Sequence, residues 1–358
     1  MTHRVAVWGT GNVGVPAIRT VLANPALELA DVIVHAEEKD GVDAGVLAGL
    51  PDCGVIATRD VDAVLARRPD ALVYAVNQDF RPAESTDEML RCLRAGVNVV
   101  TAGHYALLHP PTAPPDVKAA FEAACKEGGA TILSSGIDPG FAMDLIPVVL
   151  SGLCAGAHEI RIVENFNYAT YDVPEQVRAL IGFGSPMDRT PAMILPGVPT
   201  RVWGGALRSL ADALDVTLDD VVEVTEKHAL ERDVEVLGRA YAKGTLGAFR
   251  FEVQGLVDGH PLLVVEHITR IVDDTAKQWE SAKGMGYHAV RISGTPNVSL
   301  TLESEDEHGD HVAGGNTTAA ARITNAIPWV CDAPPGLMAA VDLPLIAGRG
   351  LLRPPEHA

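Results

Sequence analysis

The chain has 358 residues, a formal net charge of −19 at neutral pH and an apolar fraction of 47%. This length predicts two domains, and this apolar content excludes global disorder. The excess of 47 acidic over 28 basic residues disfavours nucleic acid and anionic membrane surfaces as partners. A phosphate-bearing cofactor stays compatible with the charge, because backbone N–H groups can hold phosphate locally.

The cysteines and the N-terminus indicate a cytoplasmic protein. No CxxC spacing occurs, so we expect reduced thiols rather than disulfides. The first residues run directly into an apolar strand pattern without the layout of a signal peptide. Two aspartates and two prolines interrupt the apolar stretch 132–153, which excludes a membrane-spanning helix there. The five cysteines are Cys53, Cys92, Cys125, Cys154 and Cys331.

Predicted strands and helices alternate along residues 1–145. Strands are expected at 4–8, 30–34, 71–76, 98–101 and 130–133, and helices at 13–23, 61–67, 84–95 and 117–126. Such alternation is typical of an α/β fold with a Rossmann-type doubly wound parallel sheet. We therefore expect the first domain to span residues 1–145.

The pattern changes after about residue 150. Alternating runs at 159–167, 234–242, 248–258, 261–272, 288–292 and 298–303 predict strands, and helices are expected at 212–214, 218–222 and 316–326. The pair Asp258-Gly259 predicts a hairpin, because Asp-Gly accepts positive φ. We expect an antiparallel sheet in an α+β substrate and dimerisation domain at 146–325. A Pro- and Gly-rich tail at 326–358 is expected to pack back on the first domain.

A glycine-rich turn, Gly9-Thr10-Gly11-Asn12-Val13-Gly14, follows the first strand and opens the first helix. In this context the GxGxxG spacing predicts a dinucleotide site, so NAD or NADP is the expected cofactor. The first glycine permits the tight turn, the second lets the backbone approach the pyrophosphate, and the third lets the helix pack closely on the strand.

The end of the second strand bears on the choice between NAD and NADP. His35 and Lys39 could face the 2′-phosphate of NADP, whereas Glu37 or Glu38 could accept the ribose hydroxyls of NAD. The pattern favours NADP slightly. Further cofactor contacts are expected at the ends of the next strands, from Ala75, Asn77, Thr101 and Ala102.

His104 and Tyr105 are the candidate catalytic residues, because they follow the strand whose end should approach the nicotinamide. Either could relay a proton as hydride reaches carbon. A loop histidine that is hydrogen-bonded to the backbone is an equal alternative for His104. The glycines of segment 134–140 allow a close approach at the domain junction.

Candidate substrate-binding residues lie at the end of the strand at 159–167, where polar and aromatic side chains gather. We expect Asn165, Tyr168 and Tyr171 to line a pocket, with a solvated strand end as the alternative. His308 and His311 lie in an acidic loop without further ligands at site-like spacing, so no metal site is expected.

Together with the glycine turn, segments across nearly the whole chain resemble the 2,4-diaminopentanoate dehydrogenase group. This group includes the native amine dehydrogenases and belongs to the dihydrodipicolinate reductase-like proteins. The resemblance implies a Rossmann domain, a sheet-based substrate domain, usually a homodimer, and NAD(P)-linked interconversion of an amine with a ketone plus ammonia. It also adds Phe183 to the candidate substrate-binding residues. The segments are 34–45, 135–141, 177–184, 318–328, 333–336 and 342–344.

The loop after the strand at 98–101 departs from this family. The amine-forming members carry a glutamate there that would hold or activate ammonia, but this chain has no carboxylate between Thr101 and Pro115. The first hypothesis is therefore an NAD(P)-dependent oxidoreductase acting on a C–N or C–O bond of a small molecule. The alternatives are a carbonyl or alcohol reductase that has lost amine chemistry, and an NAD(P)-binding sensor or scaffold without turnover.

Overall fold

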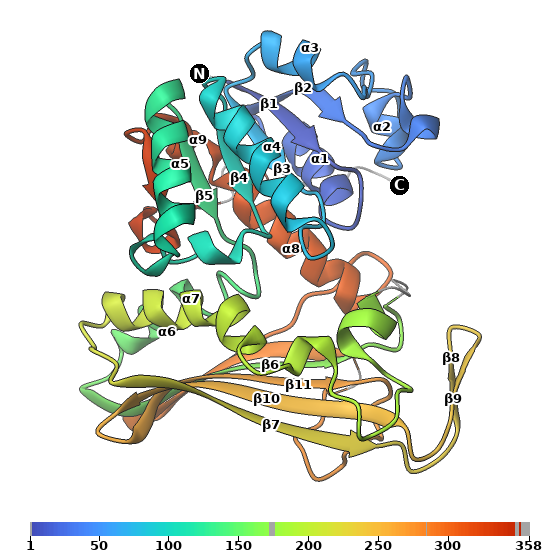
Figure 1. Ribbon diagram of the computed structural model, residues 1–358, viewed down its shortest axis with the longest axis vertical. Helices are drawn as coiled ribbons and strands as arrows, with labels where there is room; N and C mark the ends of the chain where they lie inside the picture. Colours follow the sequence, from blue (N-terminus) through green and yellow to red (C-terminus); the bar gives the residue numbers. More distant parts are fainter. Residues whose placement is uncertain (1, 172–175, 284, 348–350, 352–358) are drawn as a thin grey trace. The chain divides into compact units, whose positions relative to one another are not determined.

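The computed structural model describes residues 2–171, 176–283, 285–347 and 351 (Figure 1). It divides the chain into two compact units. Unit 1 comprises Met1–Ile137 with Asn316–Ala358, and unit 2 comprises Asp138–Gly315. The boundaries predicted from the sequence lie at 145/146 and 325/326.

Unit 1 contains a six-stranded sheet in the order β14-β5-β4-β3-β1-β2, and every pairing in it is parallel. This arrangement confirms the predicted doubly wound sheet. β14 lies in the Pro- and Gly-rich tail, for which no strand was predicted, and it adds an edge strand beside β5. The strands are β1 (His3–Trp8), β2 (Leu27–Ile33), β3 (Ala71–Tyr74), β4 (Asn98–Thr101), β5 (Thr131–Ser134) and β14 (Gly336–Met338).

Helices cover both faces of this sheet (Figure 1). α1 (Gly14–Ala23), α8 (His311–Asn325) and α9 (Ile327–Asp332) pack on one face, and α3 (Val61–Ala66), α4 (Pro82–Arg94) and α5 (Pro115–Gly128) on the other. The apolar i, i+3, i+4 spacing explains this packing, since it gives each helix one buried stripe. Short helical segments complete the unit at α2 (Ala44–Leu47), η1 (Glu37–Lys39), η2 (Tyr105–Leu107), η3 (Pro110–Thr112) and η6 (Ala340–Asp342).

Unit 2 is built on a second six-stranded sheet, in the order β13-β12-β6-β11-β10-β7. α6 (Leu145–Ser151) and α7 (Val198–Ala213) pack with the apolar side chains of one face. The other elements are β6 (Gly156–Asn167), β7 (Asp220–Ala229), β8 (Val234–Val236), β9 (Arg239–Tyr241), β10 (Leu246–Val257), β11 (His260–Arg270), β12 (Gly286–Thr295), β13 (Val298–Leu302), η4 (Gln176–Ile181) and η5 (Ala192–Ile194).

Three expectations for unit 2 were wrong. The sheet is mixed rather than antiparallel, because β6 and β11, which are distant in sequence, pair in parallel. Segment 218–222 leads into strand β7 instead of forming a helix, while α7 was largely missed. The run 234–242 is a hairpin of β8 and β9, since Leu237 and Gly238 both take positive φ. The predicted turn at Asp258-Gly259 is confirmed by the positive φ of both residues.

All five cysteines are free thiols, as expected. Within the part of the chain that the structure describes, no helix has the length and apolar character needed to cross a membrane.

Candidate functional site

The glycine turn of unit 1 joins β1 to α1, and its three glycines have different surroundings. A Cβ on Gly9 would lie 2.9 Å from the carbonyl oxygen of Ala75, and one on Gly14 would lie 2.0 Å from the carbonyl oxygen of Gly9. A Cβ on Gly11 would meet no described atom within 4 Å. Gly9 and Gly14 therefore allow close packing, while Gly11 leaves open the approach that a pyrophosphate needs.

Cationic side chains lie beside this turn. Lys39 donates through Nζ to the hydroxyl of Thr10 at 3.0 Å and to its carbonyl oxygen at 3.3 Å. His35 is exposed at the end of β2, and Arg81 NH1 lies 3.2 Å from its Nε2. Partial burial, followed by the charge of Arg81, lowers the pKa of His35. Arg81, which was not singled out from the sequence, thus adds a third basic side chain to the predicted residues His35 and Lys39.

The ends of β3 and β4 carry the other predicted cofactor contacts. Ala75 packs against Gly9, while Asn77 is exposed and accepts a hydrogen bond from the N–H of Asp79 at 2.9 Å. Thr101 is fully buried, and its hydroxyl donates to the carbonyl of Tyr74 at 3.0 Å. Thr101 therefore fixes the loop after β4 through its side chain. Asn12 is exposed, and Val13 and Ala102 are half-buried.

The loop after β4 buries His104. The side chain packs edge-on against Phe121 with ring centroids 4.8 Å apart, and its Nε2 lies 3.5 Å from the hydroxyl of Thr86. Burial lowers the pKa of His104 to about 4, so the ring is neutral near pH 7. Tyr105 donates its hydroxyl to Asp79 at 3.2 Å. This setting suits a packed structural histidine better than a proton donor.

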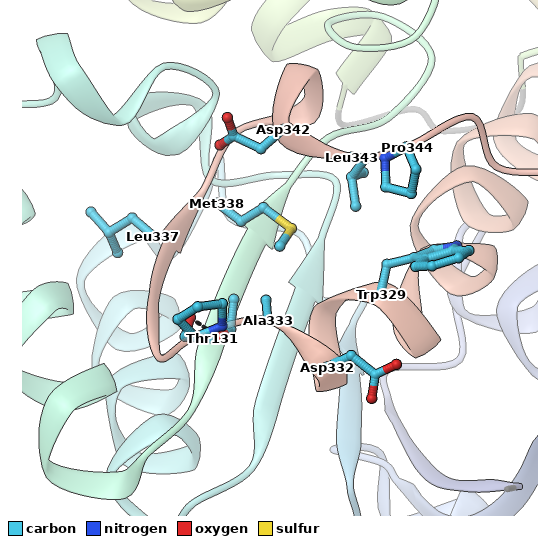
Figure 2. Close-up of a pocket in the computed structure, with 10 residues that line it drawn as sticks. Thr131, Trp329, Asp332, Ala333, Leu337, Met338, Asp342, Leu343 and Pro344 are labelled. Atoms are coloured by element: carbon cyan, nitrogen blue, oxygen red, sulfur yellow. Dashed lines mark hydrogen bonds between the residues drawn. The ribbon is translucent and has the colours of Figure 1, made fainter.

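A cavity of about 450 Å³ lies between α9 and β14 (Figure 2). It includes Thr131, the first residue of β5, whereas dinucleotides bind beyond the carboxyl ends of parallel strands. The two acidic side chains of its lining, Asp332 and Asp342, come from different ends of the tail segment and do not converge in Figure 2. We assign this cavity no part in the chemistry.

Unit 2 contains a buried cluster of four titratable side chains, Asp138, Glu164, His267 and His288. Their exposed fractions are 2%, 13%, 1% and 5%. The register of the sheet brings three of them together, because Glu164 of β6 stands opposite His267 of β11 on one side and His288 of β12 on the other. Asp138 comes from the segment that precedes α6. We call this set the carboxylate–histidine cluster.

Each histidine of the cluster lies near both carboxylates. His267 Nε2 is 3.4 Å from Asp138 Oδ1, and its Nδ1 is 3.3 Å from Glu164 Oε1. His288 Nε2 is 3.7 Å from Asp138 Oδ2 and 3.6 Å from Glu164 Oε2. These are charge contacts longer than good hydrogen bonds.

The cluster leaves buried polar atoms unsatisfied. Trp203 of α7 donates its indole N–H to Asp138 Oδ1 at 2.6 Å. In contrast, Asp138 Oδ2, both ring nitrogens of His267 and Nε2 of His288 have no hydrogen-bond partner among the described residues. Buried polar atoms in this state cost free energy unless a ligand satisfies them. The cluster is therefore a candidate site for a small polar ligand.

The pKa values in the cluster diverge. Burial disfavours charge on His267, but the carboxylates of Asp138 and Glu164 outweigh it and raise the pKa of His267 to about 10. Burial raises the pKa of Asp138, whereas the two histidines outweigh burial at Glu164 and hold its pKa well below the usual value. Environments that raise the pKa of one carboxyl group and lower that of its neighbour are typical of acid–base sites.

Aromatic side chains adjoin Glu164. The hydroxyl of Tyr168 donates to Glu164 Oε1 at 3.4 Å, and its ring lies 5.5 Å from Tyr171 and 6.5 Å from Phe183, centroid to centroid. The structure thus brings together three of the four predicted substrate residues. Asn165 lies on the opposite face of the sheet, since it is the next residue of β6, and it donates to the carbonyl of Glu280 at 2.9 Å.

The net charge of the cluster's side chains favours an ammonium group over a metal ion as its ligand. Asp138, Glu164 and His288 offer ligand atoms that all lie within 4.8 Å of one another. Protonated His267 already neutralises one of the two carboxylates, so at most one negative charge remains. That balance suits a singly charged ammonium nitrogen better than a divalent metal.

This cluster was not predicted as a site from the sequence. Asp138 lies within the family-like segment 135–141, and Glu164 opens the polar strand end, so both were visible as motifs. His267 and His288 occupy inward positions of strands that otherwise read as apolar, and no spacing links them.

Comparison with known proteins relates both the N-terminal and the C-terminal part of the chain to dehydrogenase and reductase families. Residues 3–103 match the family described as dihydrodipicolinate reductase, N-terminus, and residues 202–350 match the 2,4-diaminopentanoate dehydrogenase C-terminal domain. The chain is 46% identical over 351 residues to an amine dehydrogenase of Streptomyces virginiae, covering 97% of each chain. It is 23% identical over 289 residues to a 2,4-diaminopentanoate dehydrogenase of Acetoanaerobium sticklandii, covering 79% of this chain and 76% of that protein.

A solved structure shares the fold. The amine dehydrogenase from Mycobacterium smegmatis superposes with a TM-score of 0.76 at 23% identity, covering 98% of both chains. The predicted resemblance and fold class are confirmed. The chain belongs to the amine dehydrogenase family, next to the 2,4-diaminopentanoate dehydrogenases, and is an NAD(P)-dependent oxidoreductase.

Proposed function

We propose that this chain is an amine dehydrogenase that interconverts a small amine with a ketone plus ammonia, and that the carboxylate–histidine cluster holds the reacting nitrogen. The observation that carries the proposal is the set of buried, unsatisfied polar atoms around Asp138 Oδ2. The similarity to the amine dehydrogenase of Streptomyces virginiae supports the reaction class. The cluster supplies the carboxylate that the loop after β4 lacks.

The two carboxylates take different roles in this proposal. Glu164 stays ionised and pairs with protonated His267, because the pKa of Glu164 is low and that of His267 is about 10. Burial raises the pKa of Asp138, so it is the carboxyl group of the two that takes up a proton more readily. The indole of Trp203 occupies Oδ1 and so leaves Oδ2 as the atom that exchanges the proton.

In the reductive direction, Asp138 Oδ2 takes a proton from ammonium, and the released ammonia attacks the carbonyl carbon of the ketone. A proton passes from the attached nitrogen to the carbonyl oxygen and gives a carbinolamine. Asp138 then returns its proton to this hydroxyl group, the C–O bond breaks, and water leaves a protonated imine. When bound at the glycine turn, the reduced cofactor would supply the hydride that the imine carbon needs. Ketone, ammonium and reduced cofactor thus give amine, oxidised cofactor and water.

Tyr168, Tyr171 and Phe183 define the apolar side of the proposed substrate site. Their rings adjoin Glu164, so a substrate with its nitrogen at the cluster would place hydrocarbon against aromatic faces. An ammonium group beside such rings also gains cation–π attraction. The arrangement favours small hydrophobic amines and ketones.

We propose NADP as the preferred cofactor. Gly9, Gly11 and Gly14 would hold the pyrophosphate, and Lys39 would add positive charge beside the turn through its contacts with Thr10. Arg81 and His35 bring further nitrogen donors to the end of β2, where the ribose 2′ group lies in this fold. These donors suit a 2′-phosphate better than a free hydroxyl.

Initial rates of NADPH oxidation test the reaction. We expect oxidation with small ketones only when ammonium is also present, and formation of the amine by mass spectrometry. Equal rates without ammonium, with an alcohol as the product, would identify a carbonyl reductase instead. Cofactor binding without single turnover across ketones and aldehydes, with and without ammonium, would identify the sensor alternative.

We also infer a homodimer in the cytoplasm. The dimer rests on the family resemblance, and the cytoplasm is supported by the five free thiols. Light scattering coupled to size-exclusion chromatography measures the first, and fractionation of the source cells the second.

A further inference from the structure

Two donors converge on one nitrogen of His35. The indole Nε1 of Trp8 lies 3.2 Å from Nε2 of His35, and NH1 of Arg81 lies 3.2 Å from the same atom. An indole N–H and a guanidinium N–H can only donate. Nε2 of His35 must therefore present its lone pair, and the ring carries its single proton on Nδ1.

Both donors are held in place. Trp8 is 1% exposed at the end of β1, and its ring packs against Tyr74 with centroids 5.6 Å apart. Arg81 forms an ion pair with Glu88, NH2 to Oε1, at 2.9 Å. Glu88 of α4 thus orients the guanidinium beside the histidine. We call Trp8, Arg81 and His35 the donor lock.

The remaining nitrogen of His35 is available to a ligand. His35 is exposed, and no described residue forms a hydrogen bond to its Nδ1. It follows β2 about 20 residues after the glycine turn, the position that contacts the ribose 2′ group in this fold. An acidic residue at this position accepts hydrogen bonds from ribose hydroxyls, whereas a neutral Nδ1–H can only donate one.

We propose that the donor lock makes His35 an obligatory donor to the 2′-phosphate of NADP, and that this donor sets the preference over NAD. The inference rests on the proposed preference for NADP and deepens it by assigning the selecting atom. Partial burial, followed by the charge of Arg81, lowers the pKa of His35, which agrees with a ring that stays neutral at physiological pH.

Two substitutions of His35 distinguish the contribution of Nδ1 from that of Nε2. His35→Asn places an amide nitrogen close to the position of Nδ1, whereas His35→Gln places its amide at the position of Nε2. NADPH and NADH dissociation constants, measured by quenching of tryptophan fluorescence, should show H35N within threefold of wild type for NADPH. H35Q should lose about tenfold for NADPH and leave NADH unchanged. Equal NADPH affinities of both variants would overturn the assignment of Nδ1.

The tautomer itself is measured without reference to cofactor preference. In ¹⁵N-labelled protein, two-bond ¹H–¹⁵N correlation spectra distinguish Nδ1–H from Nε2–H rings, and comparison with H35N identifies the His35 signal. We expect the Nδ1–H form at pH 7. An Nε2–H or doubly protonated ring would overturn the donor lock. The ring could be in the Nδ1–H form while wild type binds NADH more tightly than NADPH. In that case the proposed preference for NADP is wrong, and so is the role of the donor lock in it. The proposed amine dehydrogenation would be unaffected.

Discussion

His267 and Glu164 stand directly opposite each other in the parallel pair β11 and β6, and Nδ1 of His267 lies 3.3 Å from Oε1 of Glu164. The contact joins a buried imidazolium to a carboxylate whose pKa stays well below its usual value. Because this pair uses one negative charge and burial raises the pKa of Asp138, the proposed mechanism assigns the proton transfer to Asp138. In the proposed mechanism, the sheet register thus assigns Glu164 to an ion pair that persists at neutral pH and leaves Asp138 to carry the proton.

Removal of the proton carrier tests this division. Asp138→Asn keeps the shape of the side chain but cannot accept a proton, so kcat for reductive amination should fall about 10²- to 10⁴-fold. The dissociation constant for NADPH should stay unchanged, since that site lies in unit 1. Stopped-flow or steady-state absorbance at 340 nm measures the rate.

A matched control removes a carboxylate from unit 2 without touching the cluster. Asp258→Asn replaces the exposed first residue of the β10–β11 turn, and asparagine tolerates the φ of +50° found there. This variant should retain wild-type kcat and stability. If D138N were as active as D258N, Asp138 would not be the proton carrier.

Stability should depend on pH through His267. Its pKa is about 10 in the folded chain and near 6.5 when unfolded, so the stabilisation is complete below pH 6.5 and is lost as pH rises through 10. At 1.36 kcal/mol per unit, the loss from pH 7 to pH 10 is on the order of 3 kcal/mol. Urea unfolding of wild type and His267→Gln at both pH values measures it. The difference between the two proteins should shrink towards pH 10, and a constant difference would contradict the ion pair.

The parallel sheet of unit 1 could be predicted because local patterns and long-range structure agree there. Apolar runs such as 71–74 and 98–101 are bounded by turn residues and separated by amphipathic helices. α7 was largely missed because Pro199 and Gly204 lower its helix propensity, although Trp203 and Leu207 form a buried apolar stripe. β14 has three residues, and only its pairing with β5 makes it a strand.

One candidate site could be predicted from the sequence and the other could not. The glycine turn is local in sequence, so its motif was sufficient to predict a cofactor site. The carboxylate–histidine cluster joins residues from positions 138, 164, 267 and 288, and only the register of β6, β11 and β12 brings the last three together. A spacing search cannot find such a site, because the side chains are neighbours across strands and not along one.

Lys39 should contribute to cofactor affinity through its charge. Lys39→Met keeps the aliphatic stem but removes the ammonium that contacts Thr10 beside the glycine turn. A lost charge-assisted contact corresponds to about tenfold in affinity or more, so the NADPH dissociation constant should rise by that factor. Fluorescence titration measures it, and the loss should lessen at high salt. Unchanged affinity would remove Lys39 from the phosphate site.

Replacement of His104 should affect kcat far less than replacement of Asp138, because only Asp138 is proposed to transfer a proton. A ring packed against Phe121, with a pKa of about 4, is neutral across pH 6–9 and so cannot donate a proton there as an imidazolium. His104→Gln should therefore keep kcat within about threefold, whereas loss of a general acid costs 10²-fold or more. The pH profile of kcat should also stay unchanged. A loss of the larger size with normal folding would return the proton transfer to the loop after β4.

The glycine turn offers a matched pair that separates folding from cofactor binding. In Gly11→Ala the new Cβ meets open space, so the melting temperature should stay within about 2 °C of wild type. The methyl group would stand where the pyrophosphate approaches, and we expect the NADPH dissociation constant to rise at least about tenfold.

In Gly14→Ala the Cβ would lie 2.0 Å from the carbonyl oxygen of Gly9, which is backbone and cannot move aside without shifting β1 or α1. We expect a loss of stability of about 1–3 kcal/mol or more, seen as a lower melting temperature by differential scanning fluorimetry. The two variants should therefore fail for different reasons, one in binding with an intact fold and one in folding. If G11A bound NADPH as tightly as wild type, the pyrophosphate would not approach the backbone at Gly11, and the placement of the cofactor over this turn would be wrong.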